Sequence, residues 1–482
     1  MKKTINRRIA VRMYKTGTGD FFLLRVFNST KKAFHIIVDC GSYKFNEKVF
    51  DEILNEMFIL TGGTIDLLIV SHEHKDHIYG FEKGSDIFSK FRFKKVWFAW
   101  TEDEHDPFAN DLRENYSKIR MAIHEASLKL SGLVNDQYFR NQFQFEANHK
   151  ELIANTEDFV NSIQWLDDIA SFSAEKSTGQ TMVEKFKTWQ IIKKDTEVEF
   201  REPGEVIDSL PGLEGIRFFI LGPPRDLKAL NDEGDEDDYY AKREKSSTFN
   251  FELIDALLGK EKSDNKIVYP FEKEYVVVNS KILKKQYNKE PWKCIDSDWL
   301  INAGILALKF ERCLNNTSLV FAIQLESNEH ILLFPGDAEF GNWNSWFSDL
   351  TWNLKDDKKI RNVDAKYILQ NTVFYKAGHH LSQNGTPKAK GINLMTHKEL
   401  QAFIPVDLDA ISSTWKNTMP NDYLGAFLIE KTHGRTYISG SRAKVLKNIQ
   451  TKRVKIDKKN LNVLEKLNKP FDDKFYVETE VV

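Results

Sequence analysis

Four potential metal ligands lie within six consecutive residues of this chain, in the order His72, His74, Asp76 and His77. The run 66–70 before them is short and rich in branched apolar residues, which predicts a buried strand. The stretch 78–83 after them can start a helix. The four polar residues therefore fall on a connection between a strand and a helix, where α/β proteins place their ligands.

The residue types in this stretch indicate metal chemistry. Histidine and carboxylate are the ligands of zinc and similar divalent ions, in sites that hydrolyse bonds by activating bound water. On an irregular loop, His72 and His74 can turn to one side while Asp76 and His77 converge on a second point. This arrangement predicts two metal ions with water between them. A solvated polar loop is the simpler alternative.

The order His72-x-His74-x-Asp76-His77 resembles the signature of the metallo-β-lactamase superfamily, whose fold is an αββα sandwich with the metals at one edge. Three further stretches resemble its ComEC-like branch, the hydrolase domain of the competence DNA-uptake proteins. They are Gly17-x-Gly19-Asp20, Val38-Asp39-x-Gly41 and Asn315-Asn316-x-Ser318-Leu319. The resemblance covers roughly residues 8–100, 195–225 and 310–440.

The resemblance implies roles for several later residues. Asp39, at the end of a predicted strand, is expected to orient the metal loop without binding metal. Asp337, in Gly336-Asp337, corresponds to the carboxylate that bridges both ions. The motif Gly378-His379-His380-x-Ser382 corresponds to the late histidine of the second ion; the sequence leaves open which histidine coordinates, and its position favours His379.

These roles give two ligand sets. The first ion is expected on His72, His74 and Asp337. The second ion is expected on Asp76, His77, Asp337 and His379. Zinc is the expected metal, with manganese as the alternative. Asp76 and His77 are also the predicted catalytic residues, and Asp76 is considered as a proton acceptor.

The chain departs from the family pattern at two places. Many members supply another histidine to the first ion from the loop after the strand that is predicted here at 94–100. His105 is the nearest candidate, in a setting that matches no family motif. The glycine that usually follows the paired histidines is replaced by Leu381.

The expected fold class is α/β (α+β), an αββα sandwich with two insertions. Residues 1–440 are predicted as one hydrolase domain, with a helical insertion at about 103–194 and a second insertion at about 231–300. The second half of the sandwich is expected to begin near Asn315, with closing strands at 410–413 and 436–439. Residues 441–482 are predicted as a basic C-terminal tail, because ten Lys or Arg residues face two acids between 442 and 469.

Composition limits the compartment and the partners. The formal net charge of −2 excludes a global polycation, so nucleic-acid binding must be local. Three scattered cysteines form no disulfide framework and favour a reducing compartment. A secretion signal and a membrane-spanning segment are not expected. These features predict a cytoplasmic protein that is not associated with a membrane.

The leading functional hypothesis is a metal-dependent hydrolase that acts on phosphodiesters of nucleic acid. Lys376 and Ser382, beside the late histidines, are the predicted phosphate-binding residues, and the basic tail can add phosphate contacts. One alternative substrate is a small ester, lactone, thioester, amide or cyclic nucleotide. Another is a catalytically quiet module in which the helical insertion binds a partner protein. The resemblance also raises a place in a bacterial defence system.

Overall fold

The computed structural model describes thirteen stretches of the chain, which are residues 6–27, 33–42, 44, 46–135, 181–208, 210–235, 238–239, 309–348, 350–356, 359–411, 419–450, 455–468 and 475–482. The chain divides into two compact units. Residues 1–113, 178–245 and 312–482 form the first unit, and residues 114–177 and 246–311 form the second. The second unit overlaps both predicted insertions.

The N-terminal sheet has seven strands and mixes parallel with antiparallel pairs. In spatial order they are β18 (Tyr476–Val481), β1 (Arg8–Tyr14), β2 (Phe21–Phe27), β3 (Ala33–Cys40), β5 (Leu67–Ile69), β7 (Lys95–Ala99) and β8 (Glu197–Arg201). Strands β1 to β3 form an antiparallel meander, and each is rich in apolar residues, as buried strands are.

The C-terminal sheet also has seven strands. In spatial order they are β17 (Thr436–Ile438), β16 (Gln401–Ile404), β15 (Thr372–Lys376), β12 (Ile331–Phe334), β11 (Val320–Leu325), β10 (Ile216–Gly222) and β9 (Val206–Ile207). This sheet therefore begins at β9, and the prediction that the second half begins near Asn315 was wrong. The strand predicted at 410–413 was also wrong: residues 410–411 form a bend, residues 412–413 lie outside the described stretches, and β16 lies upstream.

Two short ribbons accompany these sheets. One pairs β13 (Thr351–Asp356) with β14 (Lys359–Asp364), and the other pairs β4 (Thr64–Ile65) with β6 (Arg92–Phe93). Regular 3₁₀ turns occur at η1 (Trp100–Glu102) and η6 (Ile392–Leu394), whereas the short turn η5 (Gly378–Leu381) contains residues with non-helical backbone angles. Of these, η5 matters most for function because it carries the paired histidines.

The two large sheets pack face to face, and helices cover their outer faces. The inner core joins side chains from both sheets, such as Phe22 and Phe334, whose ring centroids lie 5.8 Å apart. Burial of these apolar side chains is the main stabilising term of such a fold. The first unit is therefore a mixed α/β structure with the layer order helix, sheet, sheet, helix.

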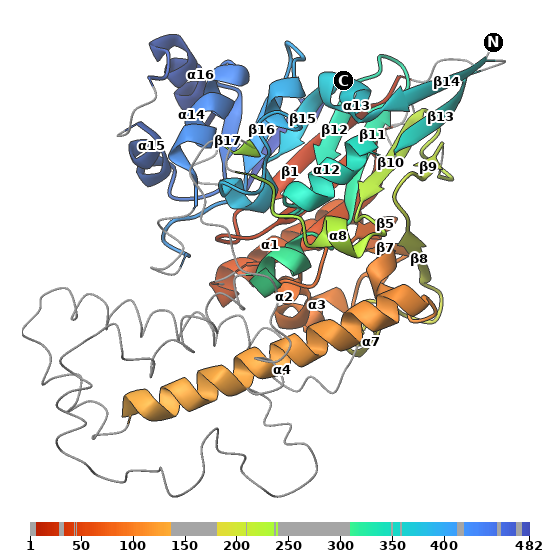
Figure 1. Cartoon of the computed structure of the whole chain (residues 1–482). Helices are drawn as coiled ribbons and strands as arrows, with labels where there is room; N and C mark the ends of the chain where they lie inside the picture. Colours follow the sequence, from red (N-terminus) through yellow and green to blue (C-terminus); the bar gives the residue numbers. More distant parts are fainter. Residues whose placement is uncertain are drawn as a thin grey trace, which may run out of the picture. The chain divides into compact units, whose positions relative to one another are not determined.

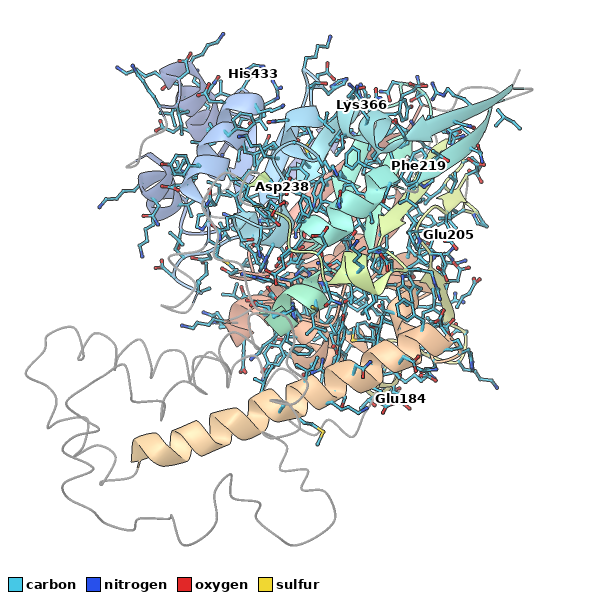
Figure 2. All side chains as sticks on the ribbon, in the orientation of Figure 1. Glu184, Glu205, Phe219, Asp238, Lys366 and His433 are labelled. Carbon is cyan, nitrogen blue, oxygen red and sulfur yellow. The ribbon has the colours of Figure 1, made fainter. Side chains whose placement is uncertain are left out.

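One group of helices covers the N-terminal sheet. It consists of α1 (Glu47–Thr61), α2 (Lys75–Lys83), α3 (Ser85–Phe88) and α7 (Met182–Thr188). The other group covers the C-terminal sheet and consists of α12 (Phe340–Ser348), α13 (Ala365–Gln370), α14 (Asp422–Lys431), α15 (Arg442–Gln450) and α16 (Lys458–Asn468). Figure 1 shows α14, α15 and α16 in blue beside β16 and β17. On that face Phe219, labelled in Figure 2, packs against Trp352.

Two more helices lie within the described stretches, α4 (Pro107–Asn135) and α8 (Leu227–Leu230). The apolar spacing at 112–123 predicts a helix, and the structure confirms one there: Leu112, Tyr116, Ile119 and Ile123 are all buried. The similar pattern at 160–169 and most of the second insertion lie outside the described residues. Among the residues that are described, no helix is both long enough and apolar enough to cross a membrane.

Residues 441–482 are not an appended tail. The last strand, β18, pairs with β1 over six residues, from Ile9 opposite Val481 to Tyr14 opposite Tyr476. Helices α15 and α16 bury Val445 and Leu464 in the core over the C-terminal sheet. The two helices were mistaken for a basic tail because lysine and arginine predominate among their charged residues. An amphipathic helix needs only a narrow apolar stripe to pack against a core.

Candidate metal centre

The predicted metal residues meet where several strands of both sheets end. Strand β3 ends just after Asp39, and β5 ends two residues before Ser71. From the other sheet, Asp337 follows β12 and the paired histidines follow β15. The candidate site therefore draws its side chains from distant segments: Asp76 and His380, which contact each other in it, are 304 residues apart.

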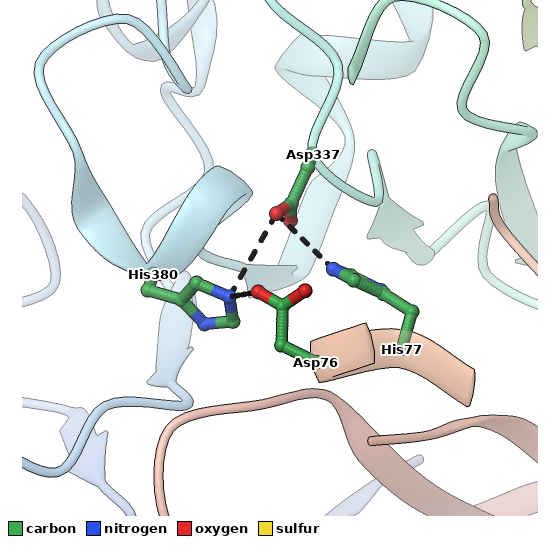
Figure 3. A group of neighbouring side chains, drawn as sticks. All are labelled: Asp76, His77, Asp337 and His380. Atoms are coloured by element: carbon green, nitrogen blue, oxygen red, sulfur yellow. Dashed lines mark hydrogen bonds and ion pairs between the residues drawn. The ribbon is translucent and has the colours of Figure 1, made fainter. Parts of the chain in front are cut away.

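Four buried side chains form the centre of the site (Figure 3). Asp76, His77, Asp337 and His380 each offer one ligand atom, and these atoms all lie within 4.8 Å of one another. His380 Nε2 lies 2.7 Å from Asp76 Oδ2 and 3.7 Å from Asp337 Oδ2, and His77 Nε2 lies 3.1 Å from the same Asp337 oxygen. Two carboxylates and two imidazoles at this spacing are a suitable ligand set for a divalent metal ion.

Local structure places Asp76 and His77. Helix α2 begins directly after His74, so Asp76 lies in its first turn, where the helix dipole stabilises a negative charge. Gly41 allows this turn to lie against the end of β3: a Cβ atom added there would lie 1.8 Å from the backbone carbon of Asp76. Any larger residue at 41 would push the two loops apart.

Asp39 orients the loop from behind. Its carboxylate accepts hydrogen bonds from the backbone N–H of Ser71 at 2.7 Å and from the Ser71 hydroxyl at 2.6 Å. It also lies 2.8 Å from His77 Nδ1. A bond from Nδ1–H to Asp39 leaves Nε2 of His77 directed at Asp337, which is how outer carboxylates orient metal-binding histidines. This geometry is the one expected of an orienting residue.

His72 and His74 lie beside the central group. Their rings are in edge contact, with Nε2 of His72 2.9 Å from Nδ1 of His74, and the His72 ring centroid lies 4.2 Å from that of His77. Burial lowers the pKa of both side chains, with further lowering from the neighbouring imidazoles. They are therefore neutral near pH 7, which is the form that binds metal.

The prediction that His379 completes the second ligand set does not match the structure. His380 is the histidine that faces Asp76, and its Nδ1 lies 2.8 Å from the backbone oxygen of Pro405. A bond from Nδ1–H to that oxygen leaves Nε2 available as a ligand. His379 instead directs Nδ1 toward Glu339, at 3.8 Å.

The reason lies in the backbone of η5. His379, His380 and Leu381 have φ values of +45°, +49° and +64°, so three successive residues adopt the left-handed conformation. With this backbone, His380 is directed toward Asp76 and His379 toward Glu339. Leu381 also occupies a position that favours glycine on conformational grounds alone.

The two predicted phosphate-binding residues are not presented to a substrate. Lys376 is 1% exposed, and its ammonium group contacts Asp20 at 2.5 Å, Asp337 at 3.2 Å and the backbone oxygen of Gly336 at 2.9 Å. Ser382 is buried, and its hydroxyl donates to Asn384 at 2.6 Å. Both residues therefore serve the interior of the site, contrary to the prediction.

His105 does not join the site. It is exposed between η1 and α4, and its backbone N–H donates to Asp103. Within the described part of the chain, neither of the two groups of clustered metal-ligating side chains includes it.

Asp20 is a buried member of the site that was not predicted as functional. The register of β2 and β3 places Phe21 opposite Cys40, so Asp20 lies beside Asp39 at the end of the hairpin. It belongs with Asp39 and His77 to a second group of side chains with potential ligand atoms within 4.8 Å. The signal was present in the sequence, since an acid directly before an apolar strand that pairs with β3 must lie at the same sheet edge.

The charges of the site favour a cation. Burial opposes the charged form of His77 and His380, but Asp337 and the other carboxylates outweigh it and raise the pKa of both imidazoles. Burial also opposes the charged form of Asp76, yet His77 and the bond from His380 lower its pKa to about 2. A divalent ion would take the place of the protons that these carboxylates attract.

Two buried atoms also fit a bound ion. Oδ1 of Asp76 and Nε2 of His77 are shielded from solvent and make no hydrogen bond to any described residue, although Nε2 forms the ion pair at 3.1 Å with Asp337. Such atoms cost free energy unless they are satisfied by a partner that is not part of the chain. The donor types, their spacing and these two atoms therefore agree with a metal site.

Comparison of the chain with protein-family models finds no match, and comparison with curated proteins finds none either. The site must therefore be interpreted from its own geometry.

Proposed function

We propose that this chain is a metal-dependent hydrolase with a metallo-β-lactamase fold of the ComEC-like type, acting on phosphodiester bonds of nucleic acid. The observation that carries the proposal is the buried group of Asp76, His77, Asp337 and His380, with ligand atoms within 4.8 Å of one another. The layer order of helix, sheet, sheet and helix supports the fold, and so does the position of the group at the strand ends.

The proposal assigns two divalent ions, with zinc preferred over manganese because imidazole ligands predominate. Asp76, His77, Asp337 and His380 would hold one ion, and His72, His74 and Asp337 the other. When bound, such ions lower the pKa of a water molecule and polarise the substrate oxygens. Asp39 keeps His77 Nδ1 engaged, and Pro405 does the same for His380 through its backbone oxygen.

Asp76 serves in this proposal as a ligand and not as a proton acceptor. A carboxylate with a pKa of about 2 is a weak base near neutral pH, whereas efficient general bases have pKa values close to the working pH. The catalytic role predicted for Asp76 and His77 therefore reduces to binding and orienting the metal.

Nucleic acid as substrate rests on charge. Residues 442–469 contain ten Lys or Arg and two acids, and in α16 the side chains of Lys458 and Lys459 are exposed. Cations of this kind supply sequence-independent contacts to phosphates. One observation favours a second candidate, hydrolysis of a small ester or lactone: Lys376 and Ser382 are buried, so two predicted phosphate contacts at the metal are missing.

The test combines metal analysis with substrate comparison. The purified chain is loaded with zinc or manganese and assayed on single-stranded DNA, RNA and small aryl esters, with Asp337→Ala as the inactive control. We expect cleavage of the polynucleotides that the control lacks. Cleavage of the esters alone would transfer the proposal to the small-molecule candidate, and a chain that binds no metal would refute both.

A charge variant then tests the basic helix. Deleting residues 442–482 is unsuitable because it removes β18 from the sheet. Lys458→Gln/Lys459→Gln changes two exposed side chains, so we expect it to fold. It should weaken polynucleotide binding, with a salt slope that falls by roughly 0.7 to 0.9 for each lost phosphate contact. An unchanged slope would show that α16 does not contact the substrate.

A further inference from the structure

A buried ammonium group lies between two carboxylates at the candidate metal centre. Nζ of Lys376 lies 2.5 Å from Oδ2 of Asp20 and 3.2 Å from Oδ1 of Asp337, and it donates to the backbone oxygen of Gly336 at 2.9 Å. Its three protons therefore have three acceptors. All three charged side chains are at most 2% exposed, so solvent screens their charges only weakly.

The lysine creates an electrostatic problem for a metal site. A cation beside Asp337 cancels the negative charge that this carboxylate offers to a divalent ion. With Lys376 alone, the pair would carry no net charge. Burial raises the pKa of Asp20, whereas the Lys376 ammonium at 2.5 Å favours its charged form. With Asp20 charged, the three groups together retain a net charge of −1 and Asp337 can still attract a metal.

The contacts also divide the two oxygens of Asp337 between different partners. Oδ1 lies near Lys376 Nζ and accepts a hydrogen bond from the backbone N–H of His379 at 3.1 Å. Oδ2 faces His77 at 3.1 Å and His380 at 3.7 Å. Lys376 therefore fixes the carboxylate so that a single oxygen is directed toward the two imidazoles.

Asp20 is itself held by the backbones of both neighbouring loops. Its N–H donates to the backbone oxygen of Asp76 at 2.7 Å, and its backbone oxygen accepts from the N–H of Gly41 at 2.9 Å. Its Oδ1 is buried without a hydrogen bond to any described residue and lies 3.9 Å from His380 Nδ1. The carboxylate is thus placed between Lys376 and the metal-facing residues.

We infer that Asp20 is a positioning residue that acts through Lys376: it offsets the charge of the lysine and so allows the lysine to orient Asp337 without suppressing metal binding. The inference rests on the proposed metal centre and assigns a role to a pair of residues outside its ligand sets. Lys376 is then a structural cation of the site, and Asp20 is the residue that makes this cation compatible with a divalent ion.

The test measures zinc affinity, by competition with a chromophoric chelator, for the full chain and its variants. Asp20→Asn keeps the shape of the side chain and removes its charge, so the three groups become neutral overall. We expect zinc binding to weaken by about 10- to 100-fold, the usual effect of losing an outer partner of a metal ligand. Asp208→Asn is the control for removing a paired carboxylate outside the site, because half-exposed Asp208 pairs at 2.6 Å with buried Arg217.

The double variant Asp20→Asn/Lys376→Met separates charge from structure. It restores the net charge of −1, so we expect tighter zinc binding than in Asp20→Asn alone. If Asp20 were only structural, the second substitution would add damage, and the double variant would bind zinc no better than the single one. That result, or unchanged affinity in Asp20→Asn, would overturn the inference.

Folding and metal binding are checked separately. Circular dichroism and thermal unfolding of the zinc-free proteins show which variants fold. If Asp20→Asn does not fold, Lys376→Met is compared with the double variant. In Lys376→Met the remaining groups carry a net charge of −2, so this variant should bind zinc more tightly than the double variant. Weaker binding would again overturn the inference. A wild-type chain that binds no zinc would refute the proposed function itself.

Discussion

Replacing each of the paired histidines separately is the most direct test of the candidate site. His380→Ala removes the imidazole that lies 2.7 Å from Asp76 and 3.7 Å from Asp337. His379→Ala removes an imidazole of the same size from the adjacent position, where it faces Glu339 at 3.8 Å. We expect the first change to abolish binding of one metal ion and the second to leave the metal content unchanged.

The magnitudes follow from these contacts. Loss of an outer partner of a metal ligand typically costs about 10- to 100-fold in affinity, so loss of the ligand His380 itself should cost more than about 100-fold. In the zinc-free protein His380→Ala also leaves Asp76 buried without its imidazole partner. Breaking a buried charge pair in this way destabilises a fold by about 3 to 5 kcal/mol. His379→Ala removes the longer contact of 3.8 Å to Glu339, so a smaller loss of stability is expected.

The assay is metal content by elemental analysis after dialysis against a limiting zinc buffer, with urea unfolding of the zinc-free proteins alongside. A finding that His379→Ala loses zinc while His380→Ala retains it would refute the reasoning. It would mean that the turn at 379–381 directs His379, and not His380, toward Asp76 and Asp337.

Three further outcomes follow from the same geometry. Asp337→Ala should lower the metal content more than any single histidine substitution, since Asp337 serves both ligand sets; retained stoichiometry would count against a bridging role. In zinc-free protein the lowered pKa of Asp76 contributes stability that is present above its ordinary value of 3.8 and is lost as pH falls through about 2. This contribution amounts to roughly 2 kcal/mol. The free energy of unfolding of Asp76→Asn, measured in urea between about pH 5 and pH 2, should therefore not include this pH-dependent loss. Leu381→Gly removes a backbone strain of about 1 to 2 kcal/mol from the left-handed φ, which stabilises the fold. It also removes a fully buried side chain, which destabilises the fold by about 2 to 5 kcal/mol. Urea unfolding should therefore show a less stable protein.

Much of the site could be predicted because its residues are close in sequence or end a clear strand. The order of residues 72–77 defines a ligand-rich loop without any knowledge of the tertiary fold. Asp39 and Asp337 each follow an apolar run that predicts a strand, and strand ends are where such residues gather. The mixed α/β class follows from the same strand and helix patterns.

The failures share a different cause, which is that side-chain direction depends on partners far away in the chain. Lys376 looks like a phosphate-binding residue in sequence, but Asp20, 356 residues earlier, turns it into a buried ion pair. Residues 476–481 look like the end of a charged tail, yet pairing with β1 makes them a strand of the sheet. Neither partner is visible in the local pattern.

The turn at 379–381 combines both effects. Its three left-handed residues cost roughly 3 to 6 kcal/mol in backbone strain, so the surrounding structure must hold them. Part of that support comes from the backbone N–H of Asn421, which donates to the oxygen of Leu381 at 2.7 Å. Another part comes from the N–H of His379, which donates to Asp337 Oδ1 at 3.1 Å. The strained turn thus directs His380 toward the cluster and fixes the same oxygen that Lys376 holds. The same turn therefore orients both His380 and the carboxylate of Asp337. The contacts that hold this turn also compensate for the strain at Leu381, which explains why a residue other than glycine is tolerated there.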